Sequence, residues 1–190
     1  MIKYNNRWWA TVRCLLFFGL AMLLLQVMVQ IFSWPVAAVA QHYLPQTARV
    51  VGRAKVIDGD TIHIRQGGRF YAIRIFGLDA PEMDSRQGVM AKAAMVALLQ
   101  PTHFVVSCIS DQQDKYHRLV AVCYKGRNFD GAPLAISMLQ SGYGFAYRRF
   151  LTADTYATYL SAEAAARQQG NGFWADKNFV RRYQASKHFH

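Results

Sequence analysis

The feature that most constrains the fold is a succession of short runs rich in β-branched and aromatic residues. The first three are separated by Asp58-Gly59-Asp60 and by Gln66-Gly67-Gly68, and two similar runs follow beyond residue 100. Such runs between turn residues are typical of β-strands, and Gly67-Gly68 favours a tight turn because both glycines tolerate positive φ. The sequence therefore predicts five strands, the first three forming a meander, over residues 49–57, 61–65, 70–76, 104–109 and 119–124.

Three other stretches have the composition of helices. Each is rich in Ala, Leu or Met and ends at a residue that stops a helix, which is Pro101, Gly142 or Gly170. The predicted helices cover residues 88–99, 132–141 and 152–169. The chain is thus expected to be an α+β protein, and five strands with three helices are compatible with a small closed β-barrel such as the OB-fold.

The N-terminal residues have the pattern of a membrane or export segment. Lys3, Arg7 and Arg13 precede an apolar run from Cys14 to about Phe32, and this run of about 19 residues is long enough to cross a hydrocarbon core of about 30 Å as a helix. The basic flank keeps the N-terminal end cytoplasmic under the positive-inside rule. A cleaved signal peptide is the alternative, because Ala38-Val39-Ala40 has the form of a cleavage site. The first interpretation predicts a single-pass transmembrane helix with an external C-terminal domain, and the second predicts a secreted protein cleaved after Ala40.

We therefore expect five parts along the chain. From Val50 onward the chain holds all 11 acidic residues and 18 of the 22 Lys and Arg, a net charge of +7. A positive surface attracts polyanions, which fits a nucleic-acid partner but also an ordinary basic protein. The expected parts are a basic cytoplasmic N-terminus (1–13), a transmembrane anchor or signal segment (14–33), a linker (34–48), a globular domain (49–176) and a solvated basic tail (177–190).

Two of the three cysteines lie in the globular part. Cys108 and Cys123 occupy similar places in the last two predicted strands, which are joined by a polar loop. If these strands pair as a hairpin, the two sulfur atoms could face each other. A disulfide is expected in an oxidising compartment, and two small buried thiols are the alternative.

Carboxylates and arginines gather in one short stretch of sequence. Asp58-Gly59-Asp60-Thr61 follows the first strand, and Arg74 precedes Asp79 and Glu82. Hard cations such as Ca²⁺ prefer several oxygen ligands, and a guanidinium matches a phosphate. An ordinary Asp-Gly turn and a structural ion pair of Arg74 are the alternatives. With a second arginine in Asp114-Lys115-Tyr116-His117-Arg118, the pattern indicates metal-assisted phosphodiester chemistry.

The combination of these motifs resembles the staphylococcal nuclease (thermonuclease) family. The resemblance rests on the order of Val56–Thr61, Arg74–Glu82 and Asp114–Arg118, and it extends from about Val51 to Trp174. It implies that the globular domain is a thermonuclease-like OB-fold, a five-stranded β-barrel with three helices.

The resemblance also implies a metal site and a general base. Asp60 and Asp79 would ligate Ca²⁺ with help from the Thr61 carbonyl, and Asp58 would lie near the metal or just outside its ligands. Glu82 would activate a water molecule for in-line attack on phosphorus.

Five further residues match positions that contact the substrate in this family. Arg74 and Arg118 would hold the phosphate and stabilise the charge of the transition state. Lys115 and Tyr116 would contact a terminal phosphate, and Tyr147 would lie near a base, unless its ring is simply part of the core.

The function implied is a Ca²⁺-dependent endonuclease or exonuclease that cleaves DNA and RNA with little sequence preference and leaves 3′-phosphates. Single-stranded substrate would be favoured, and a monomer without a protein partner is expected. The alternative is an inactive OB-fold module that only binds nucleic acid at the cell surface, although such a module would be expected to have lost Glu82 or an arginine. This chain departs from the family pattern at His117, where glycine is usual, and at Arg149, which replaces an aromatic residue. If position 117 needs positive φ, histidine costs some stability there.

Overall fold

The computed structural model describes residues 47–148 and 151–187, which belong to one compact unit spanning residues 46–190. Within these residues, no helix combines the length and apolar character needed to cross a membrane. The expected cytoplasmic N-terminus, the apolar segment 14–33 and most of the linker lie outside the described residues.

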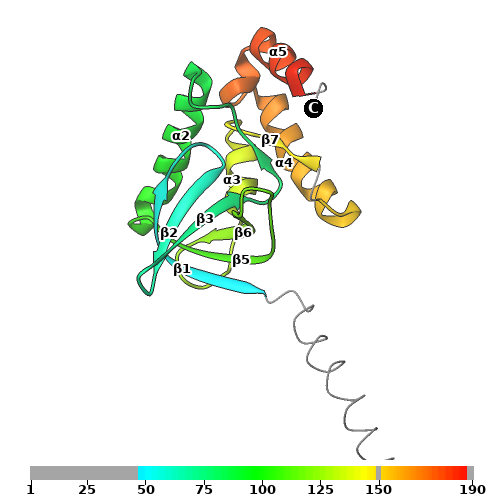
Figure 1. The fold of residues 1–190 in the computed structure, drawn as a ribbon. Helices are drawn as coiled ribbons and strands as arrows, with labels where there is room; N and C mark the ends of the chain where they lie inside the picture. The colour runs from blue at the N-terminus through cyan, green and yellow to red at the C-terminus, as the bar shows by residue number, and fades with distance from the viewer. Residues whose placement is uncertain (1–46, 149–150, 188–190) are drawn as a thin grey trace, which may run out of the picture. The chain divides into compact units, whose positions relative to one another are not determined.

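The centre of the unit is a closed five-stranded β-barrel with the strand order β1-β2-β3-β6-β5 (Figure 1). All neighbouring strands pair antiparallel except β3 and β6, which are parallel. The predicted strands and the initial meander are therefore confirmed. Their bounds are Ala48–Val56 for β1, Thr61–Gln66 for β2, Arg69–Ile75 for β3, Val105–Gln113 for β5 and Leu119–Lys125 for β6.

The barrel forms because alternate residues of its strands are apolar. Ile62 and Ile64 on β2, and Ile73 and Ile75 on β3, are essentially inaccessible to solvent. Ile62 lies opposite Ile73 in the strand register, so the two side chains enter the same layer of the core. The turn between β2 and β3 contains Gly67 and Gly68, both at positive φ, as the sequence predicted.

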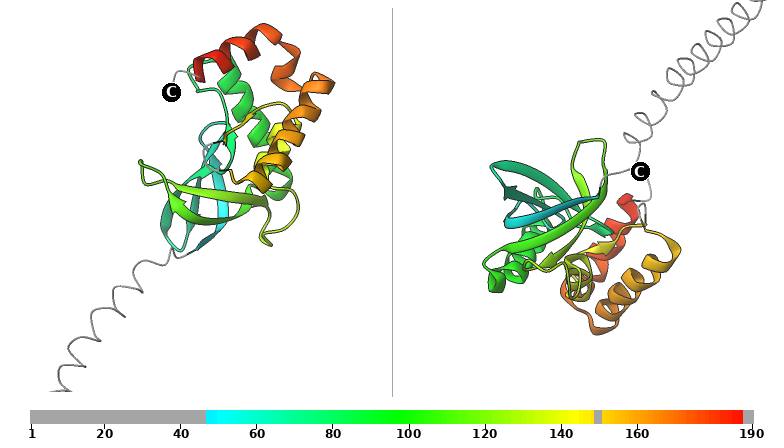
Figure 2. Two further views of the ribbon diagram at one scale, coloured as in Figure 1. Left: turned by 90° about the vertical axis from the view of Figure 1, so that its right-hand side faces the viewer. Right: turned by 90° about the horizontal axis from the view of Figure 1, so that it is seen from below.

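Four α-helices are present in the described residues, and they gather on one side of the barrel (Figures 1 and 2). The Ser85 and Thr152 hydroxyls cap the N-termini of α2 and α4. A short two-stranded sheet, in which β4 (Leu78–Asp79) pairs with β7 (Phe145–Ala146), lies beside the barrel. The helices are α2 (Arg86–Leu99), α3 (Leu134–Gln140), α4 (Ala153–Gln169) and α5 (Lys177–Lys187).

The C-terminal segment differs from the expectation of a solvated tail. Lys177–Lys187 is the helix α5, and Phe179 and Val180 on it are buried. These side chains join a second apolar cluster outside the barrel. The other buried members of this cluster are Ala80, Ala91, Phe145, Ala166, Phe173 and Trp174.

The disulfide between Cys108 and Cys123 is present in the structure. Strands β5 and β6 pair antiparallel, and the two cysteines are direct partners in the register with Cα atoms 4.1 Å apart. Both residues are buried. The bond therefore links two adjacent strands of the barrel from within.

Candidate active site

The turn between β1 and β2 is shaped by Asp58 and Gly59. Asp58 Oδ1 accepts hydrogen bonds from the backbone N–H groups of Asp60, at 2.9 Å, and Thr61, at 2.6 Å. A Cβ at position 59 would lie 2.6 Å from the Cβ atoms of both Ala80 and Ala91, so only glycine lets the turn pack this closely. Asp58 therefore supports the turn from which Asp60 emerges.

Asp60 and Asp79 come together from different parts of the chain. Asp60 Oδ2 accepts a hydrogen bond of 2.8 Å from the Ala80 N–H, which ties the first turn to the residue that follows β4. Each residue is only 8% exposed. Arg74 NH1 lies 2.5 Å from Asp60 Oδ1, and its NH2 lies 3.6 Å from Asp79 Oδ1. One guanidinium thus faces two buried carboxylates.

The electrostatics of this pair favour binding of a cation. Burial raises the pKa of Asp60 to about 7, and the charges of Asp58 and Asp79 act in the same direction, against the Arg74 charge and the Ala80 N–H. A single arginine leaves an excess of negative charge, which a hard cation would neutralise. Among the described residues, no group of three or more Asp, Glu, His or Cys side chains comes together to form a metal site by itself. The two carboxylates suit Ca²⁺, provided that water or substrate supplies the remaining oxygen ligands.

The side chain of Thr61 points toward the carboxylate of Asp60. Its carbonyl oxygen, expected from the sequence to ligate the metal, accepts hydrogen bonds from the N–H groups of Ile57 and Asp58 within the turn. Its Oγ1 donates to Asp60 Oδ1 at 3.1 Å and accepts from Arg118 NH1 at 3.4 Å. The hydroxyl therefore connects the acidic pair to the second arginine.

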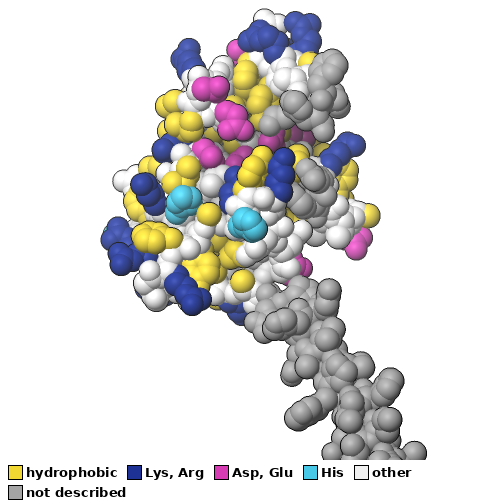
Figure 3. Space-filling model, in the orientation of Figure 1, with side chains coloured by type: hydrophobic (Ala, Val, Ile, Leu, Met, Phe, Trp, Pro, Cys, Tyr) yellow, Lys and Arg dark blue, Asp and Glu magenta, His cyan; other side chains and the backbone are white. Residues whose placement is uncertain are grey.

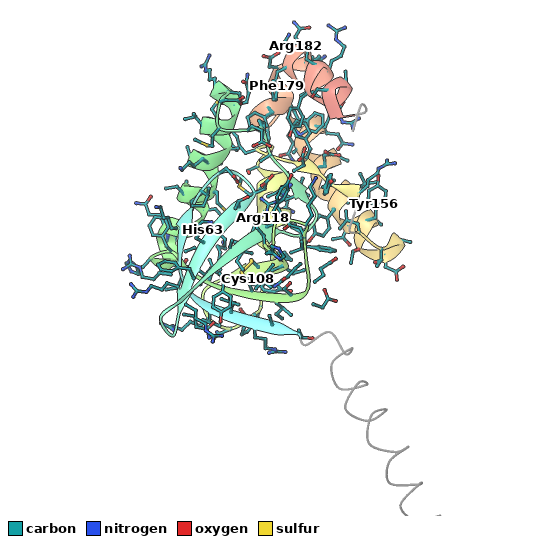
Figure 4. All side chains as sticks on the ribbon, in the orientation of Figure 1. His63, Cys108, Arg118, Tyr156, Phe179 and Arg182 are labelled. Atoms are coloured by element: carbon teal, nitrogen blue, oxygen red, sulfur yellow. A yellow bond between two sulfur atoms is a disulfide. The ribbon has the colours of Figure 1, made fainter. Side chains whose placement is uncertain are left out.

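The loop between β5 and β6 is organised by Asp114, to which the sequence analysis gave no role. Asp114 Oδ1 accepts from the backbone N–H groups of Tyr116 and Arg118, at 2.9 and 3.0 Å. Asp114 Oδ2 accepts from Arg118 Nε and lies 2.7 Å from its NH2. Desolvation is outweighed by these hydrogen bonds and by the Arg118 charge, so the pKa of Asp114 is lowered. The carboxylate thus fixes the guanidinium of Arg118, which is labelled in Figure 4 and lies beside the Thr61 hydroxyl.

The same loop presents the two side chains expected to contact a terminal phosphate. Tyr116 is 66% exposed, with the Lys115 ammonium 5.0 Å and the Arg118 guanidinium 5.4 Å from its ring centroid. His117 has a φ of 62°, so this position does require the left-handed conformation that glycine adopts most easily. Two cations and an exposed ring make a surface suited to a phosphate and a base.

Tyr147 follows β7 and reaches the first arginine. The Arg74 guanidinium lies 5.9 Å from its ring centroid, and the Tyr147 N–H donates to the Gly77 carbonyl at 2.9 Å. Its side chain is partly exposed. The structure therefore places Tyr147 at the site rather than in the core.

Glu82 lies three residues after Asp79, in the segment between β4 and α2. Its side chain is exposed, and its carbonyl accepts from the Ser85 N–H and hydroxyl at the start of α2. A Cβ on Gly88 would come within 1.9 Å of that carbonyl oxygen, so a side chain at position 88 would displace this segment. The Glu82 carboxylate faces solvent, from which water and substrate would arrive.

Tyr183 was not expected from the sequence. Its hydroxyl donates a hydrogen bond of 2.7 Å to Asp79 Oδ2. Burial raises the pKa of Tyr183, as do the charges of Asp79, Asp60 and Glu82 and the hydrogen bond to Asp79. The apolar pattern of Phe179, Val180 and Tyr183, with its helical spacing, was the signal that could have identified this residue.

The predicted site residues are thus largely brought together. Asp60, Asp79 and Arg74 form one group, and Thr61 joins it to Arg118. Figure 3 shows acidic side chains gathered on one face with Lys and Arg side chains beside them. Paired carboxylates and paired guanidinium groups on one surface can bind a cation and a phosphate together.

The chain is similar in sequence to several known proteins. Residues 72–176 match the family model described as "Staphylococcal nuclease homologue". The chain is 32% identical over 150 residues to an "Uncharacterized endonuclease" of Escherichia coli O157:H7, covering 79% of this chain and 88% of that protein. It is 28% identical over 129 residues to a "Micrococcal nuclease" of Shigella flexneri, covering 65% and 72% of the two chains. It is 31% identical over 135 residues to the "Succinoglycan biosynthesis protein ExoI" of Rhizobium meliloti, covering 66% and 64%.

Proposed function

Because this chain belongs to the staphylococcal nuclease family, we propose that it is a Ca²⁺-dependent nuclease that hydrolyses DNA and RNA with little sequence preference and leaves 3′-phosphates. The observation that carries this proposal is the convergence of buried Asp60 and Asp79 with Arg74, next to Thr61 and Arg118. The barrel supports an OB-type assignment, since its one parallel pair joins the third and fifth barrel strands.

Asp60 and Asp79 would hold the metal ion. Their carboxylate oxygens are the ligands that Ca²⁺ prefers, and their burial beside a single arginine leaves negative charge to be neutralised. Bound there, Ca²⁺ would supply Lewis-acid polarisation of the phosphate and a template for its orientation. The Thr61 hydroxyl would hold Asp60 in place through its hydrogen bond to Oδ1.

The two arginines would bind the scissile phosphate. Arg118 is already held by Asp114, so its guanidinium loses little freedom when a phosphate arrives. Arg74 would exchange part of its contact with Asp60 for the phosphate. Both charges stabilise the additional negative charge of the pentacoordinate transition state.

Glu82 would act as the general base. Its carboxylate is exposed three residues after Asp79, and it would take a proton from the water molecule that attacks phosphorus. The 5′-oxygen of the next nucleotide departs opposite this water, so the phosphate stays on the 3′ side. An arginine is too weak an acid to protonate that leaving group efficiently, so Arg118 has an electrostatic role.

Substrate contacts would extend beyond the scissile phosphate. Lys115 and exposed Tyr116 would bind a terminal phosphate, and Tyr147 would contact a base beside Arg74. Stacking on tyrosine depends little on base identity, which accounts for low sequence preference. A single strand can reach all of these contacts more easily than a duplex, and they need no second copy of the chain.

The domain would act outside the cytoplasm, either anchored through residues 14–33 or released after cleavage. The disulfide between Cys108 and Cys123 supports this location, because such bonds persist in oxidising compartments. The intact mass of the native protein distinguishes the two alternatives, since cleavage after Ala40 removes the whole apolar run.

The competing function is a module that binds nucleic acid without cleaving it. The fragment Gln41–His190 should be incubated with fluorescent single-stranded DNA and RNA in Ca²⁺ or in a chelator. We expect cleavage only with Ca²⁺, and the products should bear 3′-phosphates that a phosphatase removes. Tight binding without cleavage in either condition would instead support the binding module.

A further inference from the structure

Helix α5 lies beyond the residues that the family model matches, yet it reaches the candidate site. The match ends at residue 176, and α5 spans Lys177–Lys187. Figure 4 labels Phe179 and Arg182 on this helix. Asp176 immediately precedes the helix, and its Oδ1 accepts hydrogen bonds from the N–H groups of Asn178 and Phe179 at 3.0 Å. Its start is therefore fixed by a side-chain cap.

The inner face of α5 is anchored by aromatic packing. The Tyr183 ring stacks on Phe145 with centroids 4.6 Å apart, and Phe179 lies 5.6 Å from Tyr183. Phe179 also packs edge-on against Phe173, at 5.3 Å. Tyr183 is thus held by contacts that leave its ring little freedom to move.

Phe145, on which the Tyr183 ring stacks, is also the residue paired with Asp79 between strands β4 and β7. Phe145 on β7 lies opposite Asp79 on β4 in the strand register. The Tyr183 ring therefore rests on one member of this pair while its hydroxyl donates to the other, at Asp79 Oδ2. The second carboxylate oxygen, Oδ1, lies 3.6 Å from Arg74 NH2. The two oxygens of Asp79 thus have separate surroundings.

We propose that Tyr183 is a positioning residue for the metal site, which orients the Asp79 carboxylate toward a cation beside Asp60. This inference rests on the proposed function, because it assumes that Asp79 is a metal ligand. Hydrogen-bond donors behind a ligating group fix its orientation, and their loss typically weakens metal affinity about 10- to 100-fold. Helix α5 is thereby a part of the site rather than an appended tail.

The test compares Ca²⁺ binding by the full-length chain in detergent with that of Tyr183→Phe, by calorimetric titration with calcium chloride. The substitution removes only the hydroxyl and keeps the ring stacked on Phe145. We expect the dissociation constant to rise about tenfold. The Ca²⁺ concentration for half-maximal nuclease activity should rise to the same extent, while kcat at saturating Ca²⁺ stays near the wild-type value.

The matched control is Tyr156→Phe on α4. The Tyr156 hydroxyl is buried and has no hydrogen-bond partner among the described residues, so its removal should leave Ca²⁺ affinity unchanged. A merely structural role of Tyr183 would lower the melting temperature without changing the dissociation constant. If Tyr183→Phe does not fold, Tyr183→Leu also lacks the hydroxyl, and because it removes the ring contact with Phe145 as well, its Ca²⁺ affinity is measured well below its own melting temperature.

The outcomes separate this inference from the proposed function. If the wild type binds Ca²⁺ and Tyr183→Phe binds it equally well or more tightly, the positioning role is wrong and the nuclease proposal stands. If the wild type binds no Ca²⁺, the metal assignment is wrong, and the positioning role is overturned with it.

Discussion

Asp114 holds the guanidinium of Arg118 through a single carboxylate oxygen, with Oδ2 lying 2.7 Å from both Nε and NH2. The other oxygen accepts from the Arg118 N–H, so one side chain fixes both the loop and the arginine that it carries. This arrangement prepares Arg118 for a phosphate before any substrate is bound.

Replacing Asp114 should therefore reduce activity without unfolding the domain. In Asp114→Asn the guanidinium loses its ionic partner and becomes free to turn, and we expect kcat/KM to fall about 10- to 100-fold, in keeping with the cost of a misplaced catalytic group. Steady-state cleavage of a fluorescent oligonucleotide measures this change. Asp111→Asn, at an exposed position of β5, is the control and should behave like the wild type. Equal rates for both variants would show that Arg118 needs no support from Asp114.

His117 should make the loop less stable than glycine would. At a φ of 62°, a side chain with a branched β-carbon is strained by about 1–2 kcal/mol. We expect His117→Val to lower the free energy of unfolding by about that amount, and His117→Gly to raise it. Urea denaturation measures both. His63→Val, placed on strand β2, is the control and should change stability by less than about 0.5 kcal/mol. If valine changes the free energy of unfolding equally little at positions 117 and 63, the backbone at position 117 does not disfavour a branched side chain.

Glu163 should make stability depend on pH. Burial raises the pKa of this α4 residue. The hydrogen bond that its Oε1 accepts from the Ala146 N–H and the charges of Arg167 and Arg148 act in the opposite direction but are outweighed. A folded-state pKa above the unfolded value means that the folded protein binds more protons, so stability is lost as pH rises above about 4.5 and through the raised pKa. Glu163→Gln keeps an oxygen acceptor for Ala146 but does not titrate.

The effect of Glu163 is measured by comparing the stability of Glu163→Gln with that of the wild type. The free energy of unfolding of Glu163→Gln, minus that of the wild type, should grow as pH increases from 4 and then level off. Chemical denaturation at several pH values measures it. A difference that is constant with pH would mean that Glu163 ionises as easily in the fold as in the unfolded chain.

Loss of the disulfide should destabilise the barrel. The bond closes a loop with a sequence separation of 15 residues, for which the chain-entropy relation gives about 3 kcal/mol. We expect the double variant Cys108→Ala and Cys123→Ala to unfold at a clearly lower temperature than the oxidised protein. The same shift should appear when the wild type is fully reduced. Calorimetry with and without a reductant tests this, and an unchanged melting temperature would count against it.

The sequence was sufficient for the parts of the fold that depend on local patterns. The strand pairs β1-β2 and β2-β3 followed from runs of β-branched and aromatic residues and from Asp58-Gly59-Asp60 and Gly67-Gly68 at the turns. The disulfide followed from the matching places of Cys108 and Cys123 in two strands of a hairpin. In each case the determining residues lie in strands that follow one another along the chain or in the turn between them.

Other features depended on contacts that no local pattern records. The Ala80 N–H meets Asp60 across 20 positions, and Tyr183 meets Asp79 across 104. The basic composition of the segment Lys177–Lys187 suggested a solvated tail, although Tyr183 stands three and four positions after Val180 and Phe179, the spacing of one helix face. The Thr61 carbonyl as a metal ligand stays a prediction, and in the structure this oxygen accepts hydrogen bonds from the N–H groups of Ile57 and Asp58 within the turn.

The central claim is that this site hydrolyses phosphodiesters with Glu82 as its base, and the most direct test is the cleavage rate of Glu82→Gln. The fragment Gln41–His190 would be assayed on single-stranded DNA in saturating Ca²⁺, beside Asp84→Asn, an exposed neighbour, as the control. We predict that Glu82→Gln lowers kcat about 10²- to 10⁴-fold while DNA binding and the Asp84→Asn rate stay near wild type. A wild-type rate in Glu82→Gln, or no Ca²⁺-dependent cleavage by the wild type, would contradict it.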